Sequence, residues 1–453
     1  MSYEKSFAHL DRARRVVAGA ANTMSKRPER FVQGAYPVFL DHGHGAHVWD
    51  VDGHRYVDWI LGLGPLTLGY GHPVVNAAIR RQLQDGACFS LPHRLEVEYA
   101  EQLLPRIPCA RGDGLVRFVS TGTEADMGAA RIARLATGRD VIVKCGYLGW
   151  ADWTVAAEPV HPGVPKVMEE LVSRFTYNDL ASLDACLDEA AGNVAAIMLE
   201  PTLIEPPAPG FLEGVRERAT KIGAVLIFDE IVLGWRLALA GGQEHFGVTP
   251  DLATFGKAMA NGLPIAAIVG RRDVMEHAWP ISGTFGGNPL GLAAASAVLG
   301  LYARDPVIRM LWTLGEKFQR GFEERAKQIL VPARCVGYPV HPRIEFFLQP
   351  GDDPGRGHYT HYRLTPPLDY AMENRLAMSV FLQETAARGV LFHAAGFNTS
   401  VAHFEDPTAL DQSLAACEAA LEVVRAGLEA DDLAARLRGR PIEASVIRAA
   451  PGG

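Results

Sequence analysis

The segment LIFDEIVLGWR, residues 226–236, places two acidic side chains, Asp229 and Glu230, directly after a run of apolar residues. A short apolar run of this kind predicts a buried strand of a parallel sheet. Burying a carboxylate is costly unless the group meets a cation or a set of hydrogen-bond donors. The end of this strand is therefore expected to face a chemical group that attracts negative charge.

The sequence around this strand alternates between short apolar runs and helical patterns from about residue 70 to residue 300. Such alternation predicts an α/β domain with a mostly parallel central sheet flanked by helices. The expected strands are GLVRFVST (residues 114–121), DVIVK (140–144), VAAIMLEP (194–201), AVLIFDE (224–230) and PIAAIVG (264–270).

The two ends of the chain show other patterns. Near the N-terminus, residues 6–18 predict a helix, and HVWDVDGHRYVDW (residues 47–59) predicts a β-hairpin that turns at Asp52 and Gly53. The C-terminal part mixes one strand-like run with helical stretches, at residues 301–329, 341–349, 371–388 and 407–428. We expect an N-terminal segment (1–70), a large domain (71–300) and a smaller α+β domain (301–453), which the N-terminal segment joins.

The overall composition excludes several classes of protein. The net charge of the chain is -8 and it has no run of Lys and Arg, so we expect no nucleic-acid partner. The six cysteines are scattered and form no ligand motif, which argues against a metal site. The charged N-terminus and the lack of a long apolar run predict a cytoplasmic protein without a membrane partner.

The segment FVSTGTEADMGAARIAR, residues 118–134, joins a predicted strand to a predicted helix through Thr121, Gly122 and Thr123. The free N–H groups at the start of a helix bind anions, so this connection is a candidate phosphate site. The alternative is that Thr123 simply caps the helix.

Two further segments carry an aromatic ring and an amine. KCGYLGW (residues 144–150) places Tyr147 after a strand, where open α/β sheets bind ligands. PDLATFGKAMANGLPIAAIVG (residues 250–270) isolates Lys257 among uncharged, largely apolar residues. Burial lowers the pKa of a lysine, and a neutral amine forms Schiff bases. The alternatives are a packing tyrosine and a lysine whose amine reaches solvent.

The four segments together match the needs of pyridoxal phosphate. Its phosphate needs helix N–H groups, its ring an aromatic face, its ring nitrogen a carboxylate such as Asp229, and its aldehyde an amine such as Lys257. A Walker B strand of an ATPase is the competing interpretation of LIFDE. It fails because Gly256-Lys257 is followed by Ala258, and Asp251 stands where the P-loop needs its first glycine.

The chain resembles the class III aminotransferases, which have the fold type I architecture of pyridoxal-phosphate enzymes, and is most similar to the glutamate-1-semialdehyde 2,1-aminomutase group. The resemblance extends from about residue 10 to residue 430. It rests on DVDGHRYVDW with LGYGHP, STGTEA, PPAPGFL, LIFDEI, FGVTPDL, GKAMANGLP and GTFGGNPL.

This resemblance implies a role for each site residue. Lys257 binds the cofactor as a Schiff base, Asp229 pairs with its ring nitrogen, and Glu200 lies near its phenolic oxygen and gates the substrate. The remaining contacts of the cofactor are implied for Ile231 and Tyr147 on the two faces of the ring, for Thr121, Gly122 and Thr123 at the phosphate, and for Thr284 at the phosphate of the neighbouring subunit.

Several segments around the implied substrate site depart from the family pattern. Leu148 replaces a usual histidine, Leu63 a tryptophan, and ADWTVAAEPVHP (residues 151–162) is short where the aminomutases carry a longer Gly/Ser-rich stretch. Lys26, Arg27 and Arg30 are all candidate anchors for a substrate carboxylate, and the sequence does not choose among them.

These departures predict the same cofactor chemistry on another substrate. We expect a homodimeric aminotransferase with shared active sites, which moves an amino group from glutamate to a ketone or aldehyde of a small metabolite, for example an oxidised aminosugar of a secondary-metabolite pathway. The alternatives are an intramolecular aminomutase and a cofactor-binding protein without catalysis. The short segment at residues 151–162 argues against the first, and the retained Lys257 and Asp229 argue against the second.

Overall fold

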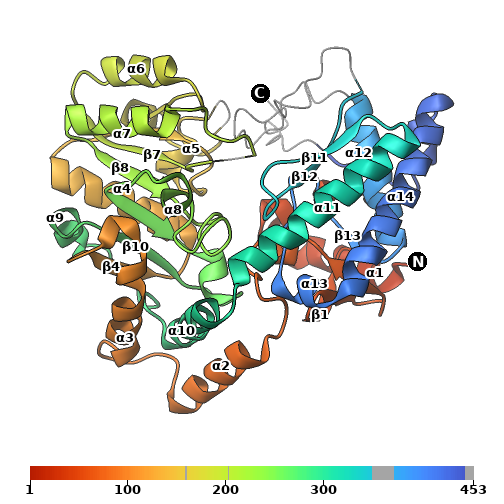
Figure 1. Ribbon diagram of the computed structural model, residues 1–453, viewed down its shortest axis with the longest axis horizontal. Coiled ribbons are helices and arrows are strands. Elements are labelled where there is room, and N and C mark those ends of the chain that lie inside the picture. The colour runs from red at the N-terminus through yellow and green to blue at the C-terminus, as the bar shows by residue number, and fades with distance from the viewer. Residues whose placement is uncertain (159–160, 203, 349–371, 444–453) are drawn as a thin grey trace. The chain divides into compact units, whose positions relative to one another are not determined.

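The computed structural model describes residues 1–158, 161–202, 204–348 and 372–443, which divide into two compact units (Figure 1). Unit 1 contains the described residues of 1–72 and those from 309 onward, and unit 2 contains those of 73–308. The three-part division drawn from the sequence at residues 70 and 300 stays a prediction. Among the described residues, no helix is both long and apolar enough to cross a membrane.

Unit 2 is built on a seven-stranded sheet with the order β4-β10-β9-β8-β7-β5-β6. Strand β10 is antiparallel to both neighbours and the other pairs are parallel, which confirms the predicted mostly parallel sheet. The strands are β4 (Leu115–Val119), β5 (Val141–Cys145), β6 (Val172–Arg174), β7 (Val194–Leu199), β8 (Val225–Asp229), β9 (Leu252–Phe255) and β10 (Ala266–Gly270). The sequence did not predict β6 and β9, because runs of three and four residues are too short to show a period.

Successive residues of each strand face opposite sides of the sheet, and helices cover both sides. Ile142 and Ile227 pack in one core with the alanines of α4 (Gly122–Thr137), whereas Val143 and Phe228 pack in another core with α7 (Phe211–Ile222). The central strands are apolar on both faces for this reason. The other helices of unit 2 are α2 (Pro73–Asp85), α3 (Arg94–Leu103), α5 (Asp152–Val155), α6 (Leu180–Glu189), α8 (Gly242–Phe246), α9 (Arg272–Met275) and α10 (Pro289–Arg304).

Unit 1 combines a four-stranded sheet, a two-stranded sheet and several helices. The predicted hairpin is confirmed as an antiparallel pair that turns at Gly53. The core of unit 1 includes the packed rings of Trp59, Phe318, Phe392 and Phe397. Its elements are α1 (Glu4–Val16), β1 (Leu40–His44), β2 (His47–Asp50), β3 (Arg55–Asp58), α11 (Val307–Ile329), β11 (Ala333–Val336), β12 (Arg343–Phe346), α12 (Met372–Ala387), β13 (Val390–Leu391), α13 (Val401–Glu405) and α14 (Pro407–Glu429).

The helical stretch predicted at residues 301–329 is interrupted. Helix α10 ends at Arg304 and α11 begins at Val307, with Asp305 in an extended conformation between them. Pro306 explains the interruption, because a proline disfavours the helical conformation of the residue before it.

Two glycines of unit 1 have the same kind of backbone conformation but differ in how closely other atoms surround them. Gly69 and Gly53 both have positive φ, +87° and +92°, but a Cβ at Gly69 would meet the Cβ of Ala402 and lie 2.8 Å from the carbonyl oxygen of Gly45, whereas one at Gly53 would meet nothing within 4 Å. We expect Gly53→Ala to cost about 1–2 kcal/mol of unfolding free energy, from backbone strain alone. Gly69→Ala should cost about 1–3 kcal/mol more, because the core must also shift. Urea denaturation of both variants measures the difference, and equal costs would contradict it.

Candidate active site

The predicted site residues of unit 2 follow the carboxyl ends of neighbouring parallel strands. Asp229 is the last residue of β8, Glu200 follows β7, Tyr147 follows β5, and Lys257 follows β9. Parallel strands place their carboxyl ends at one edge of a sheet, which is where open α/β sheets bind ligands. The structure thus places these four residues along a single edge of the sheet.

Asp229 and Lys257 form the electrostatic centre of this edge. The carboxyl group of Asp229 is 6 % exposed, and its Oδ1 accepts a hydrogen bond of 2.8 Å from the backbone N–H of Ile231. Burial raises the pKa of Asp229, and the nearby amine of Lys257 opposes this rise. Burial lowers the pKa of Lys257, against the opposing effect of Asp229, Glu200 and Asp126.

Lys257 also has an unusual backbone. Its φ is +38°, in the left-handed region that side-chain-bearing residues rarely adopt. The residue as a whole is half-buried. Strained conformations of this kind concentrate at functional sites, where the surrounding structure holds them.

Glu200 links the ends of β7 and β5. Its Oε2 accepts a hydrogen bond of 3.3 Å from the backbone N–H of Tyr147, and a Cβ at Gly146 would lie 2.8 Å from the same oxygen. Only a glycine permits this approach at a φ of +106°. Burial is the main cause that raises the pKa of Glu200 to about 8, followed by the charge of Asp229.

The proposed anion site differs in detail from the sequence-based interpretation. Helix α4 begins at Gly122, and its cap is Thr121, whose Oγ1 accepts a hydrogen bond from the backbone N–H of Glu124. The alternative that Thr123 caps the helix is therefore wrong, because the helix begins two residues earlier than that alternative requires. Gly122 and Thr123 occupy the first turn, where N–H groups have no partner within the helix.

Close approaches join this helix start to the rest of the edge. A Cβ at Gly122 would lie 2.7 Å from Cδ1 of Ile231, and one at Gly149 would lie 2.7 Å from Oγ1 of Thr123. The start of α4, the segment after β8 and the loop after β5 thus surround the same space.

Other predicted residues do not join this group within the chain. Thr284 is exposed in the loop that precedes α10. Lys26, Arg27 and Arg30 belong to unit 1, where Arg30 donates a hydrogen bond of 3.3 Å to the carbonyl oxygen of Glu443. None of the three is thereby selected as the anchor of a substrate carboxylate.

The second acid of the opening segment, Glu230, serves the fold. Its two carboxylate oxygens accept hydrogen bonds of 2.7 and 2.8 Å from the backbone N–H groups of Gly242 and Gln243, which begin α8. The two adjacent acids therefore have different partners: Glu230 fixes a helix start, and Asp229 faces the amine of Lys257.

The sequence did not predict the role of Asp126, a buried acid on α4. It is 1 % exposed, and its Oδ1 accepts a hydrogen bond of 2.7 Å from Oγ1 of Thr254. The sequence did contain a signal for a buried acid, because Asp126 falls on the same face of the helix as the buried residues Ala125, Ala129 and Ala130.

A buried ion-pair network under the loop after β5 was also missed. Lys144 is 1 % exposed, and its Nζ donates to Oε1 of Glu158 at 2.9 Å and to Oγ1 of Thr154 at 3.1 Å. Arg174 contacts the other oxygen of Glu158 at 3.0 Å, and Thr154 donates to the carbonyl oxygen of Tyr147 at 3.3 Å. This network fixes the loop that carries Tyr147 and the segment that follows it.

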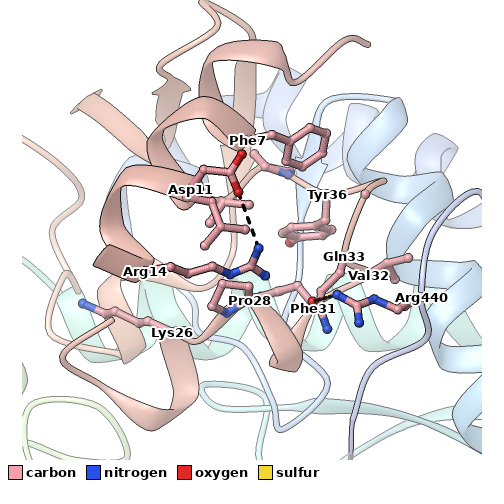
Figure 2. A pocket seen from close by; sticks show the side chains of 14 residues that line it. Phe7, Asp11, Arg14, Lys26, Pro28, Phe31, Val32, Gln33, Tyr36 and Arg440 are labelled. Carbon is pink, nitrogen blue, oxygen red and sulfur yellow. Dashed lines mark hydrogen bonds and ion pairs between the residues drawn. The ribbon is translucent and has the colours of Figure 1, made fainter. Parts of the chain in front are cut away.

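Unit 1 contains a separate cavity of about 240 Å³ at its N-terminal segment (Figure 2). Arg14, Lys26 and Arg440 give it a basic character, although Arg14 lies 3.6 Å from Asp11 and Arg440 donates to Gln33 at 2.7 Å. Its lining includes neither Asp229 nor Lys257, so the strand ends of unit 2 are the better candidate for the catalytic centre. Nor do the described residues contain a group of His, Cys, Asp and Glu placed to hold a metal ion.

Comparison with known proteins identifies relatives along most of the chain. A family model described as "Aminotransferase class-III" matches residues 31–338. The 3-aminobutyryl-CoA aminotransferase of Cloacimonas acidaminovorans (strain Evry) is 38% identical over 352 residues, which are 76% of this chain and 83% of that protein. The glutamate-1-semialdehyde 2,1-aminomutase of Syntrophobacter fumaroxidans (strain DSM 10017 / MPOB) is 36% identical over 429 residues, 89% and 94% of the two chains.

The fold has solved counterparts as well. A transaminase structure with pyridoxal phosphate (PLP) bound superimposes with a TM-score of 0.80 at 26% identity, over 94% of this chain and 99% of the other. This likeness confirms the fold type I architecture that the resemblance implied.

The raised pKa of Glu200 predicts a pH-dependent stability of the protein freed of small molecules. An unfolded glutamate titrates near about pH 4.3, whereas folded Glu200 has a pKa of about 8. Its contribution to stability is therefore complete below the unfolded value and is lost as the pH rises through about 8.

Glu200→Gln should remove this dependence, which is at most about 1.4 kcal/mol per pH unit. Denaturant titrations between about pH 5 and pH 9 compare the variant with the parent and with Glu213→Gln, a change at an exposed position. Parallel curves for parent and Glu200→Gln would show that Glu200 is ionised throughout.

Proposed function

The chain belongs to the class III aminotransferases, and we propose that it transfers an amino group between two separate small molecules at the strand ends of unit 2. Membership makes it a transaminase that depends on pyridoxal 5′-phosphate. An amino donor and a carbonyl acceptor are its small-molecule partners. When bound, the cofactor takes up the amino group of the donor and supplies a ring that accepts electrons during the transfer.

The described residues fit this cofactor. The acid Asp229 and the amine Lys257 face each other in a partly accessible space, beside a helix start that offers N–H groups to a phosphate. We propose that Lys257 holds the cofactor covalently, that Asp229 keeps its ring nitrogen protonated, and that Thr121, Gly122 and Thr123 hold its phosphate. We further propose that Tyr147 and Ile231 pack on its ring and that Glu200 controls the approach of the substrate.

The lowered pKa of Lys257 carries the catalytic part of the proposal. A lowered pKa makes the neutral amine easier to reach, and a neutral amine both attacks a carbonyl carbon and accepts a proton afterwards. The three carboxyl groups around Lys257 work against a complete loss of its charge, so the amine remains able to exchange protons. Lys257 would therefore move the proton that the amino transfer requires.

The ion-pair network of Lys144 favours an aminotransferase over an aminomutase. An aminomutase must retain its intermediate, which calls for a covering segment that opens and closes. Here Trp153 and Thr154 are buried, and Glu158 is paired with Lys144 and Arg174, so the segment after Trp150 is anchored to the strand ends. An anchored segment suits a site from which the keto product leaves and a second substrate enters.

We propose glutamate as the amino donor and a ketone or aldehyde of a small metabolite, such as an oxidised aminosugar, as the acceptor. All six cysteines are free in the described residues, which supports a reducing, cytoplasmic location. The test incubates the enzyme with nitrogen-15-labelled glutamate and a panel of carbonyl compounds, and follows the label by mass spectrometry. Transfer of the label to an acceptor supports the proposal.

The same assay separates the alternative. An aminomutase would convert glutamate-1-semialdehyde in the absence of any other donor or acceptor, and would keep its own nitrogen in the product. Conversion of this compound alone, without labelled nitrogen in the product when glutamate is added, would overturn the intermolecular proposal.

Lys257 is predicted to be the single attachment point of the cofactor. Borohydride reduction of the enzyme followed by peptide mapping should place the cofactor on the peptide with Lys257, because this amine has a lowered pKa and access to ligands. Lys144 is the internal control, since it is buried and paired. A label on Lys144 or any other lysine contradicts the assignment.

We also propose a homodimer with shared active sites, to which the surface around Thr284 adds support. Phe285 beside it is 62 % exposed, and the neighbouring loop, joined through a hydrogen bond of 3.0 Å from Asn288 to Ala87, exposes Leu91 by 79 %. Exposed apolar side chains of this size on one surface are typical of protein–protein interfaces. Two-fold symmetry would make each contact reciprocal.

Thr284→Ala should weaken cofactor retention by about 0.5–3 kcal/mol, the range that covers hydrogen bonds to neutral and to charged groups. Equilibrium dialysis measures this loss. A sharper test mixes inactive Lys257→Ala chains with inactive Thr284→Glu chains. Mixed dimers should regain one working site, because that site draws intact Lys257 and intact Thr284 from different chains. A fully active monomer would remove the basis of this prediction.

A further inference from the structure

Asp126 lies behind Asp229, on the helix that covers this face of the sheet. Thr254 is the register partner of Asp229 in the parallel pair β8–β9, so the two side chains lie next to each other. Thr254 Oγ1 donates a hydrogen bond of 2.7 Å to Oδ1 of Asp126. Helix α4 thus inserts a second carboxyl group, 1 % exposed, beside the acid that faces Lys257.

Thr254 brings the carboxyl group of Asp126 next to that of Asp229, within reach of a shared hydrogen bond. Two buried carboxylates that have both lost their protons repel each other, and a proton held by one of them removes that repulsion. The neighbouring groups decide which acid holds it. Asp229 accepts from the N–H of Ile231 and faces the amine of Lys257, and both contacts favour its charged form.

Asp126 has the opposite surroundings. Burial and the charges of Asp229 and Glu200 raise its pKa well above the usual range, and the hydrogen bond from Thr254 only partly opposes this rise. Within the cluster of Asp126, Asp229, Glu200 and Lys257, the surroundings therefore favour the protonated form of Asp126 and the charged form of Asp229. The proton belongs on Asp126.

We infer that Asp126 is a positioning residue that stays protonated and donates a hydrogen bond to the carboxylate of Asp229. This bond fixes the orientation of Asp229 and draws off part of its negative charge. Asp126 would in this way set how strongly Asp229 holds a proton on a bound partner, a consequence that rests on the proposed pairing of Asp229 with the cofactor's ring nitrogen.

The protonated state is tested first, on the protein without cofactor. Infrared spectra of protein that contains isotope-labelled aspartate should show a protonated aspartic acid at neutral pH, and Asp126→Asn should lose that band. Labelling aspartate alone keeps Glu200 out of the comparison. Absence of the band in the parent protein, or its persistence in Asp126→Asn, would overturn the inference.

The second test uses the holoenzyme and the pH dependence of its cofactor absorbance. Asparagine reproduces a neutral acid, because its NH₂ can donate to Asp229 while its carbonyl oxygen accepts from Thr254. Asp126→Asn should titrate like the parent, whereas Asp126→Ala should shift the midpoint by about one to two pH units, the size expected for a lost hydrogen bond to a charged group. A larger shift in Asp126→Asn than in Asp126→Ala would mean that Asp126 is charged, and no shift in either would mean that it does not act on Asp229; both overturn the inference.

Two measurements keep this inference separate from the proposed function. Circular dichroism confirms that the variants fold, and if Asp126→Ala does not fold, the infrared comparison of Asp126→Asn still decides. Asp229→Asn tests the pairing of Asp229 itself. If its absorbance titration and turnover match those of the parent, the role proposed for Asp229 is wrong, whereas the infrared result on Asp126 stands by itself.

Discussion

The electrostatic interaction between a buried acid and a lysine that follow neighbouring strands governs the candidate site. Neither Asp229 nor Lys257 is stable as an isolated charge in these surroundings, because each loses its hydration. Their attraction offsets part of the free-energy cost of burial, since each group favours the charged form of the other. Two further groups of the edge interact with this pair. The pKa of Glu200 depends on the charges of both Asp229 and Lys257, and the backbone N–H of Ile231 donates a hydrogen bond to the carboxylate of Asp229.

The sheet makes this contact available. Asp229 and Lys257 lie 28 positions apart in the sequence, yet β8 and β9 are adjacent and parallel, so the segments that follow them meet. Glycines then let the loops approach closely. A side chain at Gly122 would displace Ile231, and a side chain at Gly146 would displace Glu200. The site thus depends as much on residues without side chains as on the charged ones.

Sequence patterns predicted the long buried strands and the hairpin at residues 47–59, because burial over several residues gives a recognisable pattern of apolar residues. They also predicted Asp229 and Lys257, because a single charged residue in an apolar segment is conspicuous. They did not predict β6 or β9, which are too short to show a period. They also misplaced the start of α4, since Thr121 and Thr123 are equally good caps by composition and only the bond to Glu124 decides. Asp126, Lys144 and Glu158 were missed for a related reason: a buried charge is recognised only when its partner is known, and these partners lie far away or on other elements.

Two lysines near the same edge of the sheet, Lys144 in β5 and Lys257 after β9, differ in their reactivity. The amine of Lys144 is enclosed and donates hydrogen bonds to Glu158, Thr154 and the carbonyl oxygen of Gly146, so its N–H groups are all engaged. Lys257 has carboxyl neighbours as well, but no ion pair among the described residues encloses it and the residue is only half-buried. An aldehyde that diffuses to this edge therefore meets one nucleophile rather than two. The ion-pair network under the Tyr147 loop thus also gives the site chemical selectivity, because it leaves Lys144 unreactive beside a reactive Lys257.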